Sequence, residues 1–150
     1  MTEEPNLEQL TAGVRAMIPI FEAMEVTVVD AGRGRAAASI PPAPNVNHFG
    51  AMYAGSLFTV GEMLGGVLGF NTFDLDGFIP IVKSLEIKFL KPATSTVTAR
   101  TSLSEDEIAR IEAEARETGK AEFVLTAELT DENGLVVAAT EGVYQVRKML

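Results

Sequence analysis

The chain has 150 residues, of which 47% are hydrophobic and 22% are charged, a composition typical of one folded domain. Its formal net charge of -9 argues against non-specific binding to nucleic acid or to an anionic membrane. The absence of cysteine and the single histidine exclude disulfides, a cysteine nucleophile and a histidine-cluster metal site, so no metal is expected. The acidic start, Met1 to Pro5, is unlike a secretory signal, and a cytoplasmic location is expected.

The N-terminal part of the chain predicts a helical segment within residues 1–24, followed by two short strands. Apolar residues recur there at helical spacing: Leu7, Leu10, Val14 and Phe21. Pro19 should kink or end this helix. The two strands are predicted at 26–30 and 35–40, because glycines between them supply a turn. A proline-bounded loop then leads into the middle of the chain.

A long apolar segment predicts a central helix over residues 53–70. Because it is hydrophobic almost all round, it should be buried on every side. Between Phe49 and Phe73 the only charged residue is Glu62, and the run is long enough to span a bilayer. Six glycines and the central carboxylate disfavour membrane insertion, so no membrane partner is expected.

The second half of the chain predicts antiparallel strands interrupted by one charged helix. The predicted strands cover residues 79–90, 94–103, 121–129 and 135–146. Ser104 and Glu107 form a capping box that opens a helix over 104–118, and Gly119 should end it. Asn133-Gly134 predicts a hairpin turn, since this pair tolerates positive φ.

Together these elements predict one α+β domain over residues 1–150, with an antiparallel sheet of five to six strands wrapped around the central helix. A single sheet can cover only one side of that helix. A second copy of the chain should cover the other side, so we expect a homodimer or a dimer of dimers.

Glu62 is the strongest catalytic candidate. An ionised carboxylate in an apolar helix is costly unless it is paired, hydrogen-bonded or protonated. Gly55, Thr59, Glu62 and Gly66 fall on one helix face, which would form the floor of a shallow pocket. The alternative is a structural glutamate that is hydrogen-bonded across a subunit interface.

The loop and the start of the central helix add further candidates. Asn47 and His48 lie in the loop, and free N–H groups near Tyr53 and Gly55 can stabilise negative charge that develops on a substrate carbonyl. A carboxylate two turns further along could attack that carbonyl or activate a water molecule.

From Asn47 to Glu62 the sequence resembles the signature of hotdog-fold acyl-CoA thioesterases, particularly the phenylacetyl-CoA-thioesterase-like branch. The signature has an asparagine, a glycine three residues later, a glycine near the helix start and an acidic residue seven beyond it. Asn47, Gly50, Gly55 and Glu62 stand at these positions. The segment from Leu85 to Ala93 is similar to the family's strand after the helix, and the resemblance covers most of the chain beyond about residue 20.

One part of the signature differs. Tyr53 and Ala54 stand where the family usually has His-Gly, so the role of that histidine is lost or passes to Tyr53. A sub-branch with Phe-Ala-Gly-Ser at the helix start is closer to this sequence, which has Tyr53-Ala54-Gly55-Ser56.

The resemblance implies hydrolysis of acyl-CoA or acyl-carrier-protein thioesters, with no cofactor beyond the coenzyme A of the substrate. It implies Glu62 as general base or nucleophile, the Gly55 N–H as oxyanion donor, and Asn47 orienting the water or the thioester. Asn47 and Glu62 are expected to meet from different subunits. Further residues are expected to contact the substrate: His48, Tyr53, Ser56, Thr59 and Lys88.

Two other hypotheses remain open. His48 and Glu62 are 14 residues apart, the spacing of the His–Glu pair in 3-hydroxyacyl-carrier-protein dehydratases, although the proline-rich segment of those enzymes is missing. Alternatively, the chain is a non-catalytic acyl-CoA-binding hotdog module. Such a module would bind the ligand without turnover.

Overall fold

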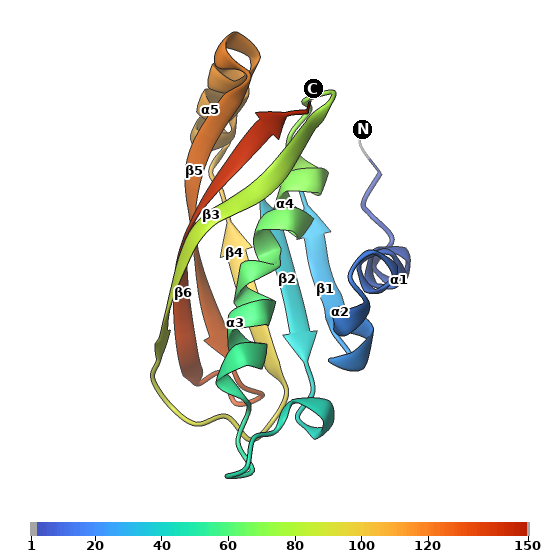
Figure 1. Ribbon diagram of the computed structural model, residues 1–150, viewed down its shortest axis with the longest axis vertical. Coiled ribbons are helices and arrows are strands. Elements are labelled where there is room, and N and C mark those ends of the chain that lie inside the picture. Colours follow the sequence, from blue (N-terminus) through green and yellow to red (C-terminus); the bar gives the residue numbers. More distant parts are fainter. Residues whose placement is uncertain (1–2, 150) are drawn as a thin grey trace.

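Six antiparallel strands form one sheet in the order β1-β2-β4-β5-β6-β3 in the computed structural model, which describes residues 3–149 (Figure 1). The strands are β1 (Thr27–Gly32), β2 (Arg35–Ile40), β3 (Phe78–Phe89), β4 (Val97–Ser102), β5 (Lys120–Thr130) and β6 (Val136–Lys148). The domain predicted over 1–150 also includes residues 1–2 and 150, which lie outside the described residues.

The hairpin between β5 and β6 shows how local sequence sets the register of the sheet. Buried and exposed residues alternate along most of β5. At the turn, the side-chain Oδ1 of Asp131 accepts hydrogen bonds from the N–H groups of Asn133 (2.9 Å) and Leu135 (3.0 Å). Gly134 has a φ of 80°, as the Asn-Gly pair predicts. The predicted hairpin is confirmed.

Strand β3 lies at one edge of the sheet. It pairs with β6 from Phe78 opposite Lys148 to Phe89 opposite Ala138, and within residues 3–149 no strand pairs with its other side. Pro80 has no N–H to donate, which suits an edge position. The result is a 12-residue strand with an open edge.

The α-helices are α1 (Leu7–Met17), α2 (Pro19–Ala23), α3 (Ala54–Glu62), α4 (Leu64–Thr72) and α5 (Glu105–Thr118), and a short 3₁₀ helix covers Ala43–Asn45. Side-chain caps begin two of them: Asn6 accepts from the N–H of Gln9, and Ser104 accepts from the N–H of Glu107. Gly119, with a φ of 84°, ends α5 where the sequence predicts.

The central helix is divided at Met63. The hydroxyl of Tyr144 on β6 donates a hydrogen bond to the carbonyl of Glu62 at 2.9 Å. The N–H of Gly66, which would bond that carbonyl in a regular helix, donates to the carbonyl of Met63 at 3.2 Å. The helix predicted over 53–70 is therefore α3 followed by α4, and it continues to Thr72.

Helices α3 and α4 lie along the inner face of the curved sheet, and α1 lies beside β1 (Figure 1). Apolar residues of the central helices form the middle of the core: Leu57, Val60, Met63, Leu64, Val67 and Leu68. The predicted α+β hotdog architecture is thus confirmed. Within residues 3–149, no helix combines the length and apolarity needed to cross a membrane.

Candidate active site

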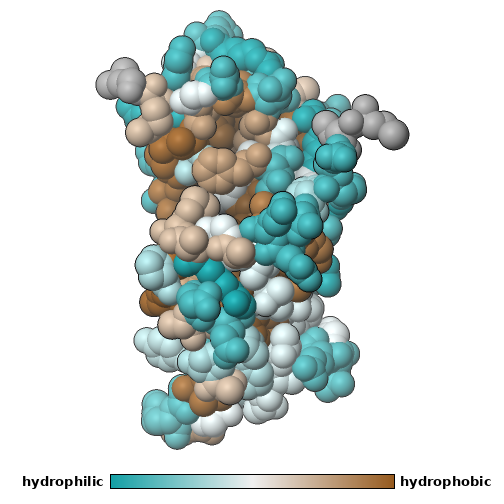
Figure 2. Space-filling view, turned by 90° about the vertical axis from the view of Figure 1, so that its right-hand side faces the viewer, coloured by the Kyte–Doolittle hydropathy of each residue, from teal (hydrophilic) through white to brown (hydrophobic). Residues whose placement is uncertain are grey.

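Glu62 lies at the end of α3 and is half-buried in the wall of a pocket. The pocket has a volume of about 370 Å³ and is enclosed by α1, the α3–α4 junction, and strands β1, β3 and β6. Figure 2 shows apolar side chains gathered around a hollow in the upper half of the face on which α1 lies. The volume falls within the range of small-molecule sites.

Most of the pocket wall is apolar. The main contributors come from three elements: Leu10, Val14 and Met17 on α1, Val67 and Phe70 on α4, and Ile81 and Val82 on β3. Phe70 remains 65% exposed, although it lines the pocket. Among residues 3–149, Glu62 is the one residue of this wall whose side chain can carry a negative charge at neutral pH. The arrangement places a carboxylate against an apolar cavity, as its sequence position predicts.

Burial raises the pKa of the Glu62 carboxyl above its ordinary value of 4.5. No cation within residues 3–149 contributes to this pKa, and desolvation is its one cause. A carboxylate with a raised pKa is a stronger proton acceptor than an exposed one, which suits a general base.

We expect wild-type stability to fall relative to Glu62→Gln as the pH rises. The folded chain binds the Glu62 proton more tightly than the unfolded chain, whose carboxyl titrates near 4.5. The stability from this proton is fully present below the unfolded pKa and is lost as the pH rises through the folded pKa. Denaturant unfolding of both proteins from acidic to neutral pH measures the effect. Parallel stability profiles for the two proteins would contradict it.

Tyr144 fixes the backbone at Glu62 and was not among the predicted site residues. Its ring lies against Gly65, where an added Cβ would overlap the ring, and its hydroxyl bonds the Glu62 carbonyl. Burial, and next the charge of Glu62, raise the pKa of Tyr144, which stays protonated. An inward-facing aromatic residue on a strand is ordinary core. The sequence feature that could have identified Tyr144 is its hydroxyl, because a buried tyrosine hydroxyl needs a hydrogen-bond partner.

The start of α3 presents free backbone donors. Within the described residues, the N–H groups of Ala54 and Gly55 have no acceptor, as expected for a first helical turn. Tyr53 caps the helix and is 57% exposed, and its ring covers the position that a Gly55 side chain would occupy. Thr59 donates its hydroxyl to the Gly55 carbonyl at 2.8 Å. Of the four residues predicted on one pocket floor, only Glu62 and Gly66 line the pocket.

Asn47 holds the loop before α3. Its Oδ1 accepts hydrogen bonds from the N–H groups of Phe49 (2.8 Å) and Ala51 (3.1 Å). Within residues 3–149 its amide nitrogen donates no hydrogen bond, and the residue is half-buried. Asn47 lines a groove with Leu57 and Phe89, separate from the pocket that contains Glu62.

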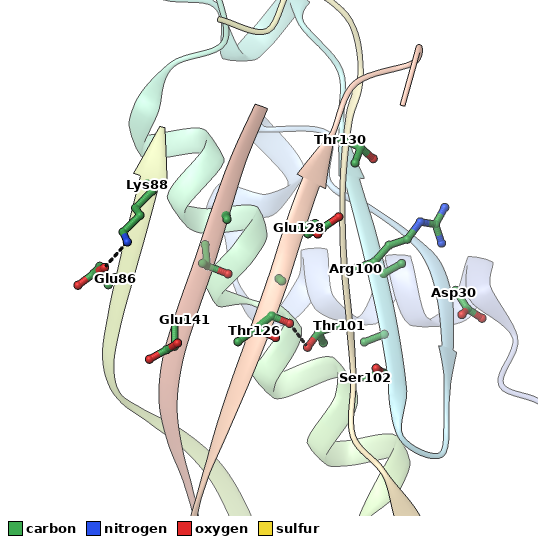
Figure 3. Close-up of a pocket in the computed structure, with 15 residues that line it drawn as sticks. Asp30, Glu86, Lys88, Arg100, Thr101, Ser102, Thr126, Glu128, Thr130 and Glu141 are labelled. Atoms are coloured by element: carbon green, nitrogen blue, oxygen red, sulfur yellow. Dashed lines mark hydrogen bonds and ion pairs between the residues drawn. The ribbon is translucent and has the colours of Figure 1, made fainter. Parts of the chain in front are cut away.

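The other predicted contact residues lie apart from Glu62 within the chain. His48 is exposed in the loop, its ring 3.9 Å from that of Phe49 between centroids, and Ser56 is buried in α3. Lys88 lies in a groove on the face of the sheet turned away from the central helix, where its Nζ is 3.9 Å from Glu86 (Figure 3). Other charged side chains line this groove: Asp30, Arg100, Glu128 and Glu141.

Similarity to other proteins places the chain in a family. Residues 7–146 match a family described as a domain of unknown function, DUF4442. The chain belongs to the DUF4442 family. No curated protein matches it.

Solved structures resemble this DUF4442 protein along nearly its whole length. Protein PA5026 from Pseudomonas aeruginosa, of unknown function and described as a "Probable Thioesterase", is 36% identical, with 99% of this chain and 100% of that chain covered and a TM-score of 0.88. Thioesterase HI1161 from Haemophilus influenzae is 16% identical, with coverage of 99% and 94% and a TM-score of 0.77. A mutant of thioesterase PA1618 from Pseudomonas aeruginosa is 18% identical, with coverage of 98% and 97% and a TM-score of 0.77.

These similarities confirm the hotdog thioesterase superfamily that the segment from Asn47 to Glu62 predicts for this DUF4442 chain. The two more distant structures support the fold alone. Membership of the phenylacetyl-CoA-thioesterase-like branch stays a prediction.

Proposed function

We propose that this protein hydrolyses acyl-CoA or acyl-carrier-protein thioesters, with Glu62 as the general base or nucleophile. The observation that carries the proposal is the Glu62 carboxylate, which faces an apolar pocket without a compensating cation from residues 3–149. The 36% identity to a protein described as a "Probable Thioesterase" supports the same reaction class.

The proposed chemistry follows from this geometry. As a base, Glu62 takes a proton from water while the water oxygen bonds to the thioester carbonyl carbon. The tetrahedral intermediate then collapses, the C–S bond breaks, and the departing coenzyme A thiolate takes up a proton. As a nucleophile, a Glu62 carboxylate oxygen instead bonds to the carbonyl carbon, and the C–S bond breaks to release the coenzyme A thiolate, which takes up a proton. Water then hydrolyses the resulting anhydride to the carboxylic acid and returns the free Glu62 carboxylate. Both routes yield a carboxylic acid and a free thiol.

The oxyanion donor is proposed to come from the start of α3. The free Gly55 N–H points out of a helix N-terminus, where the helix dipole favours negative charge. Glu62 lies seven positions beyond Gly55 in α3, a rise of about 10 Å along the helix. An attacking group and an oxyanion donor act about 3 Å from the reacting carbonyl. This separation favours a site in which Gly55 of one chain faces Glu62 of another.

A homodimer, or a dimer of dimers, would complete such a site. The open edge of β3 offers backbone hydrogen bonds to a second copy. The central helices, which pack against β3, also carry two exposed aromatic side chains, Phe58 on α3 (38% exposed) and Phe70 on α4 (65% exposed). Pairing of two chains across this edge would cover both features and bring the helix start of one chain towards the pocket of the other.

Mixing two inactive variants tests the shared site. We expect Asn47→Ala and Glu62→Gln to be inactive alone and to regain about a quarter of wild-type activity when co-expressed. Half of the dimers are then mixed, and each mixed dimer has one intact site of two. Thiol release per dimer measures this recovery. If mass spectrometry shows mixed dimers but no activity is recovered, Asn47 and Glu62 of one chain belong to the same site.

The dehydratase hypothesis requires His48 beside Glu62. His48 does not line the pocket of its own chain. Thioester hydrolysis releases a thiol, whereas dehydration changes the acyl chain and leaves the thioester intact. Because the chain contains no cysteine, a thiol reagent reports only released coenzyme A. Conversion of a 3-hydroxyacyl-CoA without thiol release would replace the thioesterase proposal with the dehydratase hypothesis.

A further inference from the structure

The helical glycines divide into two groups by their surroundings. At Gly55, Gly61, Gly65 and Gly69 an added Cβ would lie within 3.0 Å of another side chain, so a larger residue would force a neighbour of the same chain to shift. At Gly13 and Gly66 nothing lies within 4 Å of an added Cβ. Among the helical glycines of residues 3–149, these two alone have no steric reason in the chain for being glycine.

Both open glycines line the same pocket. Gly13 lies on α1 and Gly66 lies on α4, and both contribute to the wall that contains Glu62. Each glycine in a helix interior costs about 1 kcal/mol relative to alanine. Gly66 lies four residues beyond Glu62, across the interruption at Met63, and both residues line the pocket, so the space above Gly66 belongs to the cavity that contains the carboxylate.

We propose that this pocket holds the acyl chain of the thioester, and that Gly13 and Gly66 set the chain length it accepts. The inference rests on the proposed function and adds the substrate class. The walls from α1, α4 and β3 are largely aliphatic and aromatic, which suits a hydrocarbon chain and not a phosphate or a sugar.

The volume indicates a chain of medium length. At about 30 Å³ per water-sized group, the pocket of about 370 Å³ holds about twelve such groups if it is completely filled. An acyl chain of about eight carbons fits with space to spare, whereas a palmitoyl chain exceeds the volume. Glu62 in the wall also favours the neutral thioester substrate over the ionised product. A neutral thioester carbonyl is accepted beside it, while an ionised fatty acid product is repelled, which favours product release.

Chain-length selectivity of Gly66→Leu tests the proposal. Hydrolysis rates are measured from acetyl-CoA to palmitoyl-CoA for the wild type, Gly66→Leu, Gly13→Leu and a control, Ala12→Leu. Ala12 is exposed on α1 and does not line this pocket. We expect both glycine variants to lower kcat/KM for octanoyl-CoA relative to butyryl-CoA by about tenfold, the effect of losing burial of about two methylene groups. Ala12→Leu should keep the wild-type profile.

A binding measurement separates this inference from the proposed function. S-octyl-CoA has a thioether in place of the thioester, so it binds without reacting. Its affinity is measured by calorimetry for the same four proteins. If no acyl-CoA is hydrolysed but Gly66→Leu weakens S-octyl-CoA binding about tenfold, the proposed function fails and the acyl pocket stands. Equal affinity in wild type and both glycine variants overturns the pocket, whether or not hydrolysis occurs.

Folding and assembly of the variants are checked by thermal unfolding and light scattering. Both substitutions remove a helical glycine at an open position, so we expect unfolding temperatures at or above that of the wild type. A changed number of subunits in both glycine variants would assign the open space to a subunit contact and overturn the proposal.

Discussion

Glu62→Gln is expected to reduce thioester hydrolysis by about 100-fold or more, the usual effect of losing a general base. Glutamine has nearly the shape of glutamate but can neither accept the proton of an attacking water nor attack a carbonyl. The pocket around it is apolar, and among residues 3–149 no other carboxylate or imidazole lines it, so no described neighbour in the wall can replace the base. Steady-state thiol release measures the effect on kcat.

The binding step should survive this substitution. The acyl chain is proposed to contact the apolar wall, which Glu62→Gln leaves in place, so S-octyl-CoA should bind as tightly as to the wild type. Glu117→Gln, on the exposed side of α5, is the matched control and should retain full activity. Equal turnover by wild type and Glu62→Gln would exclude Glu62 from the chemistry and leave it a structural residue.

Two adjacent glycines should respond in opposite ways to the same substitution. Alanine at either position gains about 1 kcal/mol of helix propensity relative to glycine. At Gly65 the new methyl group would overlap the Tyr144 ring, and overpacking of this kind typically costs about 1–3 kcal/mol. At Gly66 the methyl group meets open space. Gly65→Ala should therefore be about 1–3 kcal/mol less stable than Gly66→Ala, because the propensity gain is common to both.

Thermal and denaturant unfolding measure this difference, and 1 kcal/mol corresponds to about 2–4 °C in Tm for a domain of this size. A second consequence concerns the site. Displacement of Tyr144 by Gly65→Ala should break its hydrogen bond to the Glu62 carbonyl and move the carboxylate, lowering activity as well as stability. Equal stability of the two alanine variants would show that Tyr144 moves aside at little cost and does not fix the helix at Glu62.

The fold was predictable because local sequence patterns identify its helices, strands and turns. Alternation marks β5, the Asn133-Gly134 pair marks the hairpin, and Ser104 and Gly119 mark the ends of α5. The interruption of the central helix at Met63 was not predictable in this way. It depends on Tyr144, which lies 82 residues beyond Glu62 in the chain. No local pattern states which strand residue will meet which turn of the helix.

The candidate site was predictable in part for the same reason. The spacing of Glu62 and Gly66 already places them on one helix face, and the structure brings both into the pocket. The contribution of α1 to the pocket wall was not predictable. The amphipathic pattern shows that Leu10 and Val14 point inward, but it does not identify the helix and strands across the pocket from them. Lys88 lies on the outer face of the sheet, as the alternation with Ile87 implies, away from the pocket of its own chain.

Release of coenzyme A from octanoyl-CoA by the wild-type protein, followed with a thiol reagent, shows whether this protein is a thioesterase that uses Glu62. We expect many turnovers per chain, loss of about 100-fold or more in Glu62→Gln, and slower release from palmitoyl-CoA. Absence of thiol release from octanoyl-CoA and from every other acyl-CoA, by protein that is folded and binds S-octyl-CoA, would contradict this expectation and leave an acyl-binding protein without hydrolase activity.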